Sequence, residues 1–233
     1  MTTSQVSQVV DHVIRQRKTL KCLRDPAARY SQPISLSEAQ QQALQTMVEV
    51  AGWAPFHKLA DEATHRESEL TSVVPWRFYV LEPTSCNRLL DFLEVQAETY
   101  PESPWTRAWN SKIPKLIAGA GALVQVTWLP DPTDDADLKP QLTINNMEHI
   151  AAASAAVQNL LLAAEARGWH TYWSSGGILK TPEVLDYLGI ARTQMLLGSI
   201  FLTPADAPIG NQQPGGLRDK RGEVTDWARW VTL

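Results

Sequence analysis

The chain has 233 residues, 44% of them hydrophobic, so it can bury one sizeable core, and we expect a single domain over residues 1–233. Its formal net charge of -4 and its isoelectric point of about 5.7 argue against nonspecific binding of nucleic acid as the main activity. Cys22 and Cys86 stand in no metal-ligand spacing, and no basic region followed by an apolar run opens the chain, so we expect free thiols and a cytoplasmic protein.

The chain begins with a predicted amphipathic helix. Its valine stripe, which should pack on something apolar, consists of Val6, Val9, Val10, Val13 and Ile14. Cations follow the helix, namely Arg15, Arg17, Lys18, Lys21 and Arg24. Taken alone, they fit a solvated helix end, because cations favour a helix C-terminus. A capping-box pattern at Ser37 and Gln40 predicts a second helix that ends at Gly52.

Residues 56–74 are polar and mixed in charge, which predicts a long loop with at most one helical turn. Further helices are predicted over residues 84–99, 105–117 with a kink or break at Pro114, 146–168, and 182–189 with Thr181 as the cap. Strands are predicted over residues 77–81, 122–128, 169–173 and 195–203. Residues 129–140 are the most linker-like, and residues 204–216 are predicted to be a loop. The class is α/β or α+β with a mostly covered sheet.

The predicted helix over residues 146–168 is apolar on nearly every side. Such a helix must be wrapped by other elements or by a second subunit. Ser154, Gln158 and Asn159 interrupt an apolar run that is already shorter than the ~20 residues that a bilayer requires. We therefore interpret it as a core helix and not as a membrane span.

The residues give no sign of hydrolytic or metal chemistry. The five histidines show no metal-ligand spacing, and Ser174 and Ser175 do not form a nucleophile-elbow pattern. Gly119 and Gly121 lack the third glycine of a phosphate-binding loop. If the protein is an enzyme, a cofactor is expected to carry the chemistry.

Three regions resemble the FMN-dependent nitroreductase family. Residues 14–23, IRQRKTLKCL, are similar to the helix-ending pattern I-x-x-R-R-S-x-R-x-F. Ala54-Pro55, followed by the PWRF of residues 75–78, resembles A-P-S-x-x-N-x-Q-P-W-x-F. Residues 155–177, AAVQNLLLAAEARGWHTYWSSGG, resemble A-x-Q-N-L-L-L-A-A-x-x-x-G-L-G-S-x-W, and the later strand and the RDKRGEVTDW tail follow in the family's order.

The resemblance implies an α+β fold with a central, mainly antiparallel sheet surrounded by helices. It also implies an intertwined homodimer that holds FMN in each of two interface sites, with NADH or NADPH as co-substrate. The cofactor-binding residues that it implies are Arg17, Lys18, Thr19, Lys21, Pro55, His57, Trp76, Ser175, Gly176, Gly177, Arg218 and Arg221.

The resemblance assigns these residues separate roles. Arg17, Lys18 and Thr19 would contact the phosphate and the ribityl chain, and Lys21 would approach the flavin pyrimidine. The turn at residues 175–177 would pass beside the ring. Arg218 and Arg221 are candidates for phosphate contacts from the tail, while Lys112 and Lys115 are either a further flavin-edge pair or a solvated helix face.

The chain departs from the family pattern between Pro55 and Pro75. An insertion of roughly a dozen residues within residues 57–73 is longer than a usual connection. Phe56 and His57 replace small polar residues, although APFHK is similar to the A-P-N-H-[KR] of minimal nitroreductases. We expect the insertion to form a lid or to lengthen the dimer contact.

The expected function is an FMN-dependent oxidoreductase that takes a hydride from NAD(P)H and reduces a nitroaromatic, a quinone or an enone in two half-reactions. One alternative keeps the fold and cofactor but changes the reaction to dehalogenation, azoline oxidation or flavin fragmentation. Another is a dimeric module without turnover, with or without flavin. Nucleic-acid binding through residues 15–24 is disfavoured by the acidic net charge.

Overall fold

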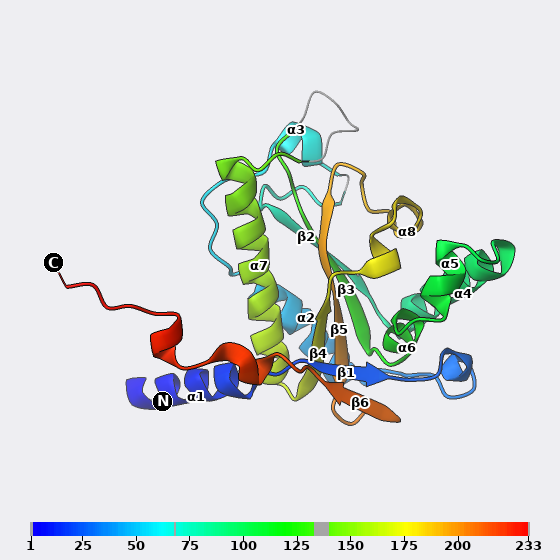
Figure 1. Cartoon of the computed structure of the whole chain (residues 1–233), viewed down its shortest axis with the longest axis horizontal. Helices are drawn as coiled ribbons and strands as arrows, with labels where there is room; N and C mark the ends of the chain where they lie inside the picture. Colours follow the sequence, from blue (N-terminus) through cyan, green and yellow to red (C-terminus); the bar gives the residue numbers. More distant parts are fainter. Residues whose placement is uncertain (1, 68, 133–139, 233) are drawn as a thin grey trace.

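The computed structural model describes residues 2–67, 69–132 and 140–232 (Figure 1). The helices are α1 (Thr3–Gln16), α2 (Glu38–Ala51), α3 (Glu62–His65), α4 (Pro83–Thr99), α5 (Pro104–Trp109), α6 (Ile113–Ala118), α7 (Ile144–Glu165) and α8 (Pro182–Tyr187). The strands are β1 (Leu20–Leu23), β2 (Trp76–Leu81), β3 (Ala122–Trp128), β4 (Trp169–Ser174), β5 (Met195–Pro204) and β6 (Asn211–Pro214). Short 3-10 helices are η1 (Pro26–Arg29), η2 (Gly177–Lys180), η3 (Arg218–Arg221) and η4 (Val224–Asp226). The predicted helices and the four predicted strands are confirmed, and most of the linker-like stretch, residues 133–139, lies outside the described residues.

Four antiparallel strands form the central sheet in the order β2-β3-β5-β4. β3 runs through its middle, where Val124 pairs with Val80 on one side and with Ile200 on the other. All residues of β3 are buried, as expected for a strand covered on both faces. The predicted α+β class with a mainly antiparallel sheet is therefore confirmed.

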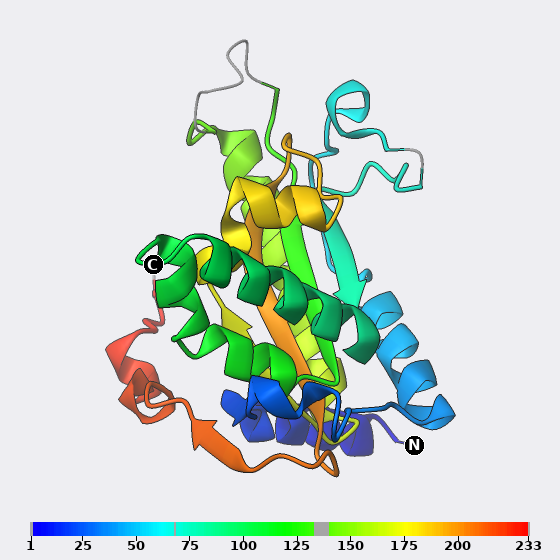
Figure 2. The same cartoon turned by 90° about the vertical axis from the view of Figure 1, so that its right-hand side faces the viewer.

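Helices cover both faces of this sheet. Successive residues of a strand point to opposite faces, so Leu123 and Val124 enter different cores. Leu123 packs with Phe201 and the buried side chains of α4 and α6, whereas Val124 packs with Ile200 and those of α2 and α7. Figure 2 shows α4 to α6, in green, in front of the sheet. The sheet therefore separates two apolar layers.

The long helix α7 is covered by this chain on one side only. Its N-cap Thr143 accepts a hydrogen bond from the Asn146 backbone N–H at 3.1 Å. Val157 and Leu160 are fully buried against the sheet and α2, while Ala151 and Gln158 are exposed. The other elements of the chain thus leave part of α7 uncovered.

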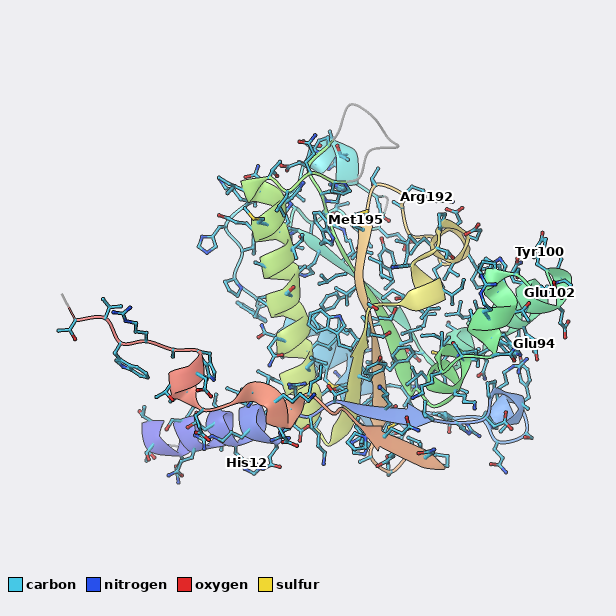
Figure 3. All side chains as sticks on the ribbon, viewed as in Figure 1. His12, Glu94, Tyr100, Glu102, Arg192 and Met195 are labelled. Carbon is cyan, nitrogen blue, oxygen red and sulfur yellow. The ribbon has the colours of Figure 1, made fainter. Side chains whose placement is uncertain are left out.

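The described residues leave most of the valine stripe of α1 exposed, although α1 lies beside α7 and Val13 is half-buried. No residue of α1 is buried, and Val6, Val9, Val10 and Ile14 are each about half exposed, at 46 to 50%. Figure 1 shows α1 extending away from the sheet beside the C-terminal tail, and Figure 3 shows His12 of α1 at the outer edge of the molecule. The amphipathic helix is confirmed, but the described part of the chain covers its apolar stripe only in part.

Two strands that the sequence did not predict form a separate antiparallel ribbon. Leu20 pairs with Pro214 and Leu23 with Asn211, so β1 joins the start of the chain to β6 near its end. A parallel bridge between Thr19 and Thr171 connects this ribbon to β4. The prediction of a loop over residues 204–216 was wrong here, because four-residue strands carry too little pattern and depend on a partner distant in sequence.

The break before α6 and the start of α8 refine two further predictions. The chain divides at residues 110–112, and Pro114 lies in the first turn of α6, where a missing N–H costs nothing. Pro182 is the first residue of α8, as predicted. The Thr181 side chain does not cap that helix, because its hydroxyl donates to the Ile178 carbonyl at 2.9 Å.

The insertion segment, which we define as residues 59–73, is fixed to the sheet. It contains the predicted single helical turn as α3, and the Ala60 N–H donates to the Val73 carbonyl at 2.9 Å, closing its base. The Tyr79 hydroxyl lies 3.2 Å from a Glu67 carboxylate oxygen and 3.0 Å from Gln194 Oε1. Burial raises the pKa of Tyr79 to about 12, so this hydroxyl remains a donor at neutral pH.

None of the helices in the described ranges is long and apolar enough to cross a membrane.

Candidate functional site

A cavity of about 570 Å³ lies where the end of α1, the β1–β6 ribbon, the edge strand β4 and η3 meet. This volume is within the usual range for small-molecule sites. The predicted cofactor-binding residues that line it come from both ends of the chain and are Arg17, Lys18, Thr19, Lys21, Arg218 and Arg221. We call it the cationic cavity.

Local backbone geometry brings the first group of these residues to the cavity. Arg17 is the C-cap of α1, and its N–H donates to the Val13 carbonyl at 3.0 Å. The chain then continues through Thr19 into β1, and the Gly215 N–H donates to the Thr19 carbonyl at 2.9 Å. A Cβ on Gly215 would lie 2.9 Å from Thr19 Cβ, so the tail approaches this closely only because residue 215 is glycine.

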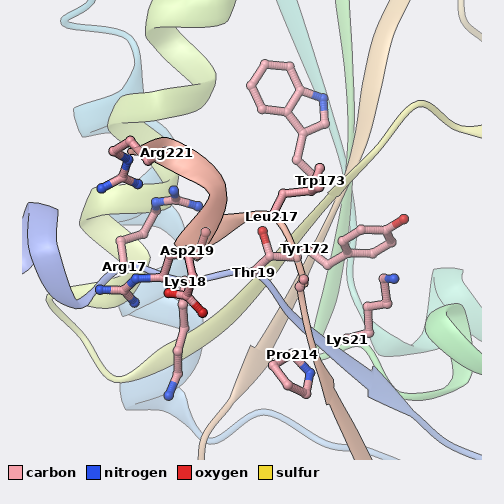
Figure 4. A pocket seen from close by; sticks show the side chains of 13 residues that line it. Arg17, Lys18, Thr19, Lys21, Tyr172, Trp173, Pro214, Leu217, Asp219 and Arg221 are labelled. Carbon is pink, nitrogen blue, oxygen red and sulfur yellow. The ribbon is translucent and has the colours of Figure 1, made fainter. Parts of the chain in front are cut away.

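The tail brings the second group of cations to the same space. η3 carries Arg218 and Arg221, and both line the cavity. Figure 4 shows Arg221 on the same side of the cavity as Arg17. Within the described part of the chain none of these cations forms an ion pair, and Asp219 is the carboxylate among the lining residues. Such a concentration of cations, in a protein with net charge -4, fits an anionic ligand.

An aromatic wall faces the cations. β4 is an edge strand, and its consecutive residues Tyr172 and Trp173 both line the cavity. Lys21 Nζ lies 5.1 Å from the centroid of the Tyr172 ring, which itself stacks on Phe201 with centroids 5.9 Å apart. Figure 4 shows the two aromatic side chains leaving the strand in different directions. The cavity therefore combines a charged end with flat apolar surfaces.

The predicted turn at residues 175–177 follows this wall directly. Ser175 and Gly177 are exposed, and Gly176 has a φ of +94°, which is a conformation that favours glycine. The Gly176 N–H donates to Ser174 Oγ at 3.2 Å. These residues do not line the cationic cavity, but they adjoin Trp173, which does.

Three other predicted residues lie at the opposite edge of the sheet. Pro55 and His57 are exposed on the segment between α2 and α3. Trp76 is buried at the start of β2, where it pairs with Trp128 and meets the Phe56 ring edge-on at 5.6 Å. Because β2 and β4 are the two edge strands, one chain does not bring these residues to the cationic cavity.

Lys112 and Lys115 line a second cavity of about 570 Å³ beside the β1–β6 ribbon. Lys112 Nζ donates to Gln213 Oε1 at 3.2 Å, and Gln213 pairs with Lys21 across the ribbon. The two lysines therefore lie near the cationic cavity without lining it.

Sequence reasoning missed the remaining lining residues, which are Tyr172, Trp173, Leu217, Asp219 and residues 214–216. Tyr172 and Trp173 had a usable signal, since they immediately precede the predicted Ser175-Gly176-Gly177 turn at the end of a strand. Residues 214–217 had none, because they come to the site through the pairing of β6 with β1.

Among the described residues, no group of three or more His, Cys, Asp or Glu side chains is arranged to hold a metal ion. His65 and His149 are both buried and bind neighbouring backbone carbonyls. His65 Nε2 lies 2.7 Å from the Pro130 oxygen, and His149 Nδ1 lies 2.7 Å from the Leu129 oxygen. These two histidines therefore bind main-chain carbonyls in the core.

Comparison with known proteins places this fold among nitroreductases. The chain is similar to the structure of a nitroreductase-like family protein from Bacillus cereus, with 22% identity, 95% of each chain covered and a TM-score of 0.62. The FMN-dependent nitroreductase NfnB from Mycobacterium smegmatis, in complex with NADPH, gives 15% identity, coverage of 97% of this chain and 100% of that one, and a TM-score of 0.60. A nitroreductase with bound FMN from Desulfitobacterium hafniense gives 17% identity, coverage of 96% and 98%, and a TM-score of 0.56.

Among curated proteins, none matches the chain. The model of the nitroreductase family matches residues 35–202, which include α2, α7 and the central sheet except for the last two residues of β5. The matched region begins after the cations of residues 17–21 and ends before those of residues 218–221. The family match therefore does not include the cations of the cavity, and their positions come from the structure alone. With a family model that covers most of its length, the chain belongs to the nitroreductase family.

Proposed function

We propose that the protein is an FMN-dependent oxidoreductase that accepts a hydride from NADH or NADPH and reduces an electron-poor acceptor such as a nitroaromatic, a quinone or an enone. The observation that carries the proposal is the cationic cavity, in which cations from residues 17–21 and 218–221 face an aromatic wall. FMN has the matching parts, since a phosphate dianion at one end is joined to a flat conjugated ring. Nitroreductases of this fold that have FMN bound support the same cofactor.

The cationic end fits the phosphate. Charge-assisted hydrogen bonds from guanidinium and ammonium groups to phosphate are about twice as strong as neutral ones. Arg17 lies at the end of α1 and Arg221 lies in η3, so the two guanidinium groups can donate hydrogen bonds to a phosphate from two sides. Thr19 adds a hydroxyl, and the unsubstituted backbone at residues 215–216 lets a ligand approach the main chain closely.

Lys21 is placed to stabilise negative charge on the ring. It extends from β1 over Tyr172 and is half-buried, so its ammonium group lies at the wall of the cavity. A fixed cation at this position favours a ring that has gained electrons, because preorganised charge needs no reorganisation during the reaction.

We further propose that the active form is a homodimer and that the partner completes the site. The uncovered stripe of α1 and the open side of α7 are apolar surfaces that a second copy would bury. Pro55, His57 and Trp76 lie at the sheet edge opposite the cationic cavity, so they would reach a flavin only across such an interface. This places two equivalent sites at the interface of the dimer.

Bound FMN would supply the redox chemistry, by taking a hydride and passing the electrons to the acceptor. The protein's residues would hold the phosphate, orient the ring, exclude water from one of its faces and leave space for donor and acceptor in turn. No side-chain nucleophile is required, and water can supply the protons. We therefore assign binding and positioning roles to the residues of the cavity and name no catalytic base.

Steady-state kinetics with purified FMN-loaded protein tests this proposal. Initial rates are measured against NADH or NADPH at several fixed concentrations of nitrobenzene and of a quinone. A two-half-reaction enzyme gives parallel double-reciprocal lines, whereas a ternary-complex enzyme gives intersecting lines. Absence of turnover with every donor and acceptor pair, in protein that keeps its flavin, would instead identify a non-catalytic binding module.

A further inference from the structure

Trp173 presents a flat ring to the cationic cavity from a rigid element. It lies in β4, and 36% of its surface is exposed although the strand belongs to the central sheet. Within the residues that the structure describes, its indole N–H has no hydrogen-bond partner. Its neighbour Tyr172 is already engaged, since the Tyr172 ring stacks on Phe201 and lies under Lys21. Trp173 is therefore the aromatic face in this cavity that remains free for a ligand.

A glycine in the next strand determines where this indole lies. A Cβ built on Gly198 would stand 2.2 Å from Trp173 Nε1, 2.7 Å from its Cδ1 and 2.8 Å from the Ser174 carbonyl oxygen, so the pyrrole edge of the indole rests directly on the Gly198 backbone. Any side chain there must displace the indole. Gly198 is not among the residues with positive φ, so its backbone conformation suits other residues and space is the reason for the glycine.

The sheet geometry explains how the two residues meet. Trp173 pairs with Ile200 across β4 and β5, and positions two apart in a strand share a face. The indole therefore extends diagonally from its own pair to Gly198, within the reach of a large aromatic side chain. Gly198 pairs with Val126 beside an irregularity in the β3–β5 ladder, where Leu197 has no partner on β3.

We propose that Trp173 is the stacking platform for the flat conjugated ring of a ligand in the cationic cavity, and that Gly198 is the positioning residue that holds the indole in place. The inference rests on the proposed function in one respect. If the cations bind the phosphate of a ligand, as proposed for FMN, the ring of the same ligand would lie against the aromatic wall. The chemistry recognised is a planar, electron-poor ring, which both the isoalloxazine of FMN and an aromatic acceptor possess.

Variants of Trp173 show whether the stacked ring is that of the flavin or that of an aromatic acceptor. Affinities for FMN and for riboflavin, which lacks the phosphate, are measured by fluorescence titration in the wild type, Trp173→Leu and Trp173→Phe. If the flavin ring stacks on Trp173, Trp173→Leu should bind FMN and riboflavin each about tenfold more weakly than the wild type. Trp173→Phe should recover part of this affinity. If the acceptor is the stacked ring instead, flavin affinity is retained and KM rises about tenfold for nitrobenzene but not for the non-aromatic enone but-3-en-2-one.

Gly198 is tested through Trp173 by a double-mutant cycle. Gly198→Ala should weaken ligand binding as Trp173→Leu does. Its effect on ligand affinity should be much smaller in the Trp173→Leu background, where only its contact with the Ser174 carbonyl remains, than in the wild type. Gly210→Ala is the control, because a Cβ at Gly210 meets no atom within 4 Å and the residue lies outside the cationic cavity. It should leave flavin affinity unchanged.

The outcomes distinguish this inference from the proposed function. Flavin and acceptor constants that are unchanged in Trp173→Leu would overturn the platform, even if NAD(P)H still reduces the flavin. Independent, additive effects of Gly198→Ala and Trp173→Leu would overturn the positioning role. Tenfold weaker binding of riboflavin by Trp173→Leu, in a protein whose flavin NAD(P)H does not reduce, would support the platform and contradict the oxidoreductase.

Discussion

The guanidinium of Arg218 donates a hydrogen bond to the backbone carbonyl of Arg15, which joins the C-terminal tail to the end of α1. A second contact runs from Arg218 Nη1 to the Gln16 carbonyl at 3.4 Å. A cation is favoured at this position, because the last carbonyls of a helix have no partners in the helix and carry partial negative charge. Arg218 therefore closes the wall of the cationic cavity, and much of its hydrogen-bonding capacity is used in doing so.

This contact divides the roles of the two tail arginines. We expect Arg221→Ala to weaken FMN binding about tenfold or more while the melting temperature stays within a degree or so, since it loses a charge-assisted contact to phosphate. Arg218→Ala should lower both FMN affinity and the melting temperature, because the tail loses its anchor. Flavin titration and thermal unfolding of the two variants without ligand are the measurements. Equal decreases in the melting temperatures of Arg218→Ala and Arg221→Ala would contradict these separate roles.

Arg17→Ala tests the position of the phosphate directly. Arg17 is at the exit of α1, where no core packing depends on its side chain, so the variant should fold normally and bind FMN far more weakly than the wild type. Riboflavin, which lacks the phosphate, should bind both proteins with similar affinity. A variant that keeps its full flavin content after dialysis would show that the phosphate lies elsewhere.

The exposed stripe of α1 predicts a dimer contact. Val10→Asp places a charge on a helix that has no buried residue in the monomer, so the free energy of unfolding of the monomer should change little. The dimer should dissociate at concentrations at least tenfold higher than in the wild type, since burying an unpaired carboxylate is costly. Sedimentation velocity over a concentration series measures this, with Gln8→Asp, an exposed position on the opposite face of α1, as control. Dissociation unchanged by Val10→Asp would remove α1 from the interface.

Arg77 should be the residue that holds the insertion segment. Its side chain is 5% exposed and donates to the carbonyls of Ser72 at 2.6 Å, Trp76 at 2.9 Å and Val74 at 3.0 Å. Arg77→Gln leaves the buried Trp76 carbonyl and the part-buried carbonyls of Ser72 and Val74 unpaired, so we expect a loss of about 3 kcal/mol in the free energy of unfolding and faster hydrogen exchange over residues 59–73. Arg66 has the same side chain in the same segment but is exposed, and Arg66→Gln should change stability by less than about 0.5 kcal/mol.

His65 should make the protein less stable in mild acid. Burial lowers the pKa of His65 below its ordinary value of 6.5, and Arg77 nearby opposes its charged form as well, while Asp61 and the hydrogen bond to Pro130 act in the other direction. The unfolded chain then binds more protons than the folded one below pH 6.5, so stability falls as the pH drops from 6.5 through the folded pKa.

Denaturant unfolding between pH 7.5 and 5 measures this effect. His65→Gln should show a smaller loss of stability across that range than the wild type, although it starts lower because the contact with Pro130 is weakened. His12→Gln, a change on exposed α1, should keep the full acid response. The same slope in His65→Gln and wild type would mean that other groups cause the acid sensitivity.

The parts of the fold that the sequence predicted are those set by neighbouring residues. The Ser37 and Gln40 capping box of α2 is present in both directions, at 3.3 and 2.9 Å, because both partners lie within one turn. The apolar run of β3, and Pro182 and Gly189 at the two ends of α8, are likewise signals carried by residues close together in sequence. The β1–β6 ribbon is not, since its paired residues Leu20 and Pro214 come from opposite ends of the sequence.

The candidate site divides in the same way. The family resemblance indicated Arg17, Lys18, Thr19, Lys21, Arg218 and Arg221, and the structure brings these together in one cavity. It did not indicate Trp173 as a wall residue, because that role depends on the absence of a side chain at Gly198 in another strand. Pro55, His57 and Trp76 remain predictions, since their place in a site depends on the second copy.

The most direct test of the oxidoreductase is the visible absorbance spectrum of the protein after FMN has been added and excess removed by gel filtration, recorded without oxygen before and after NADH or NADPH. We predict a flavin band that stays with the protein, bleaches on addition of the nucleotide and returns when nitrobenzene or a quinone is added. A colourless protein, or a bound band that neither nucleotide bleaches, would contradict the proposed function.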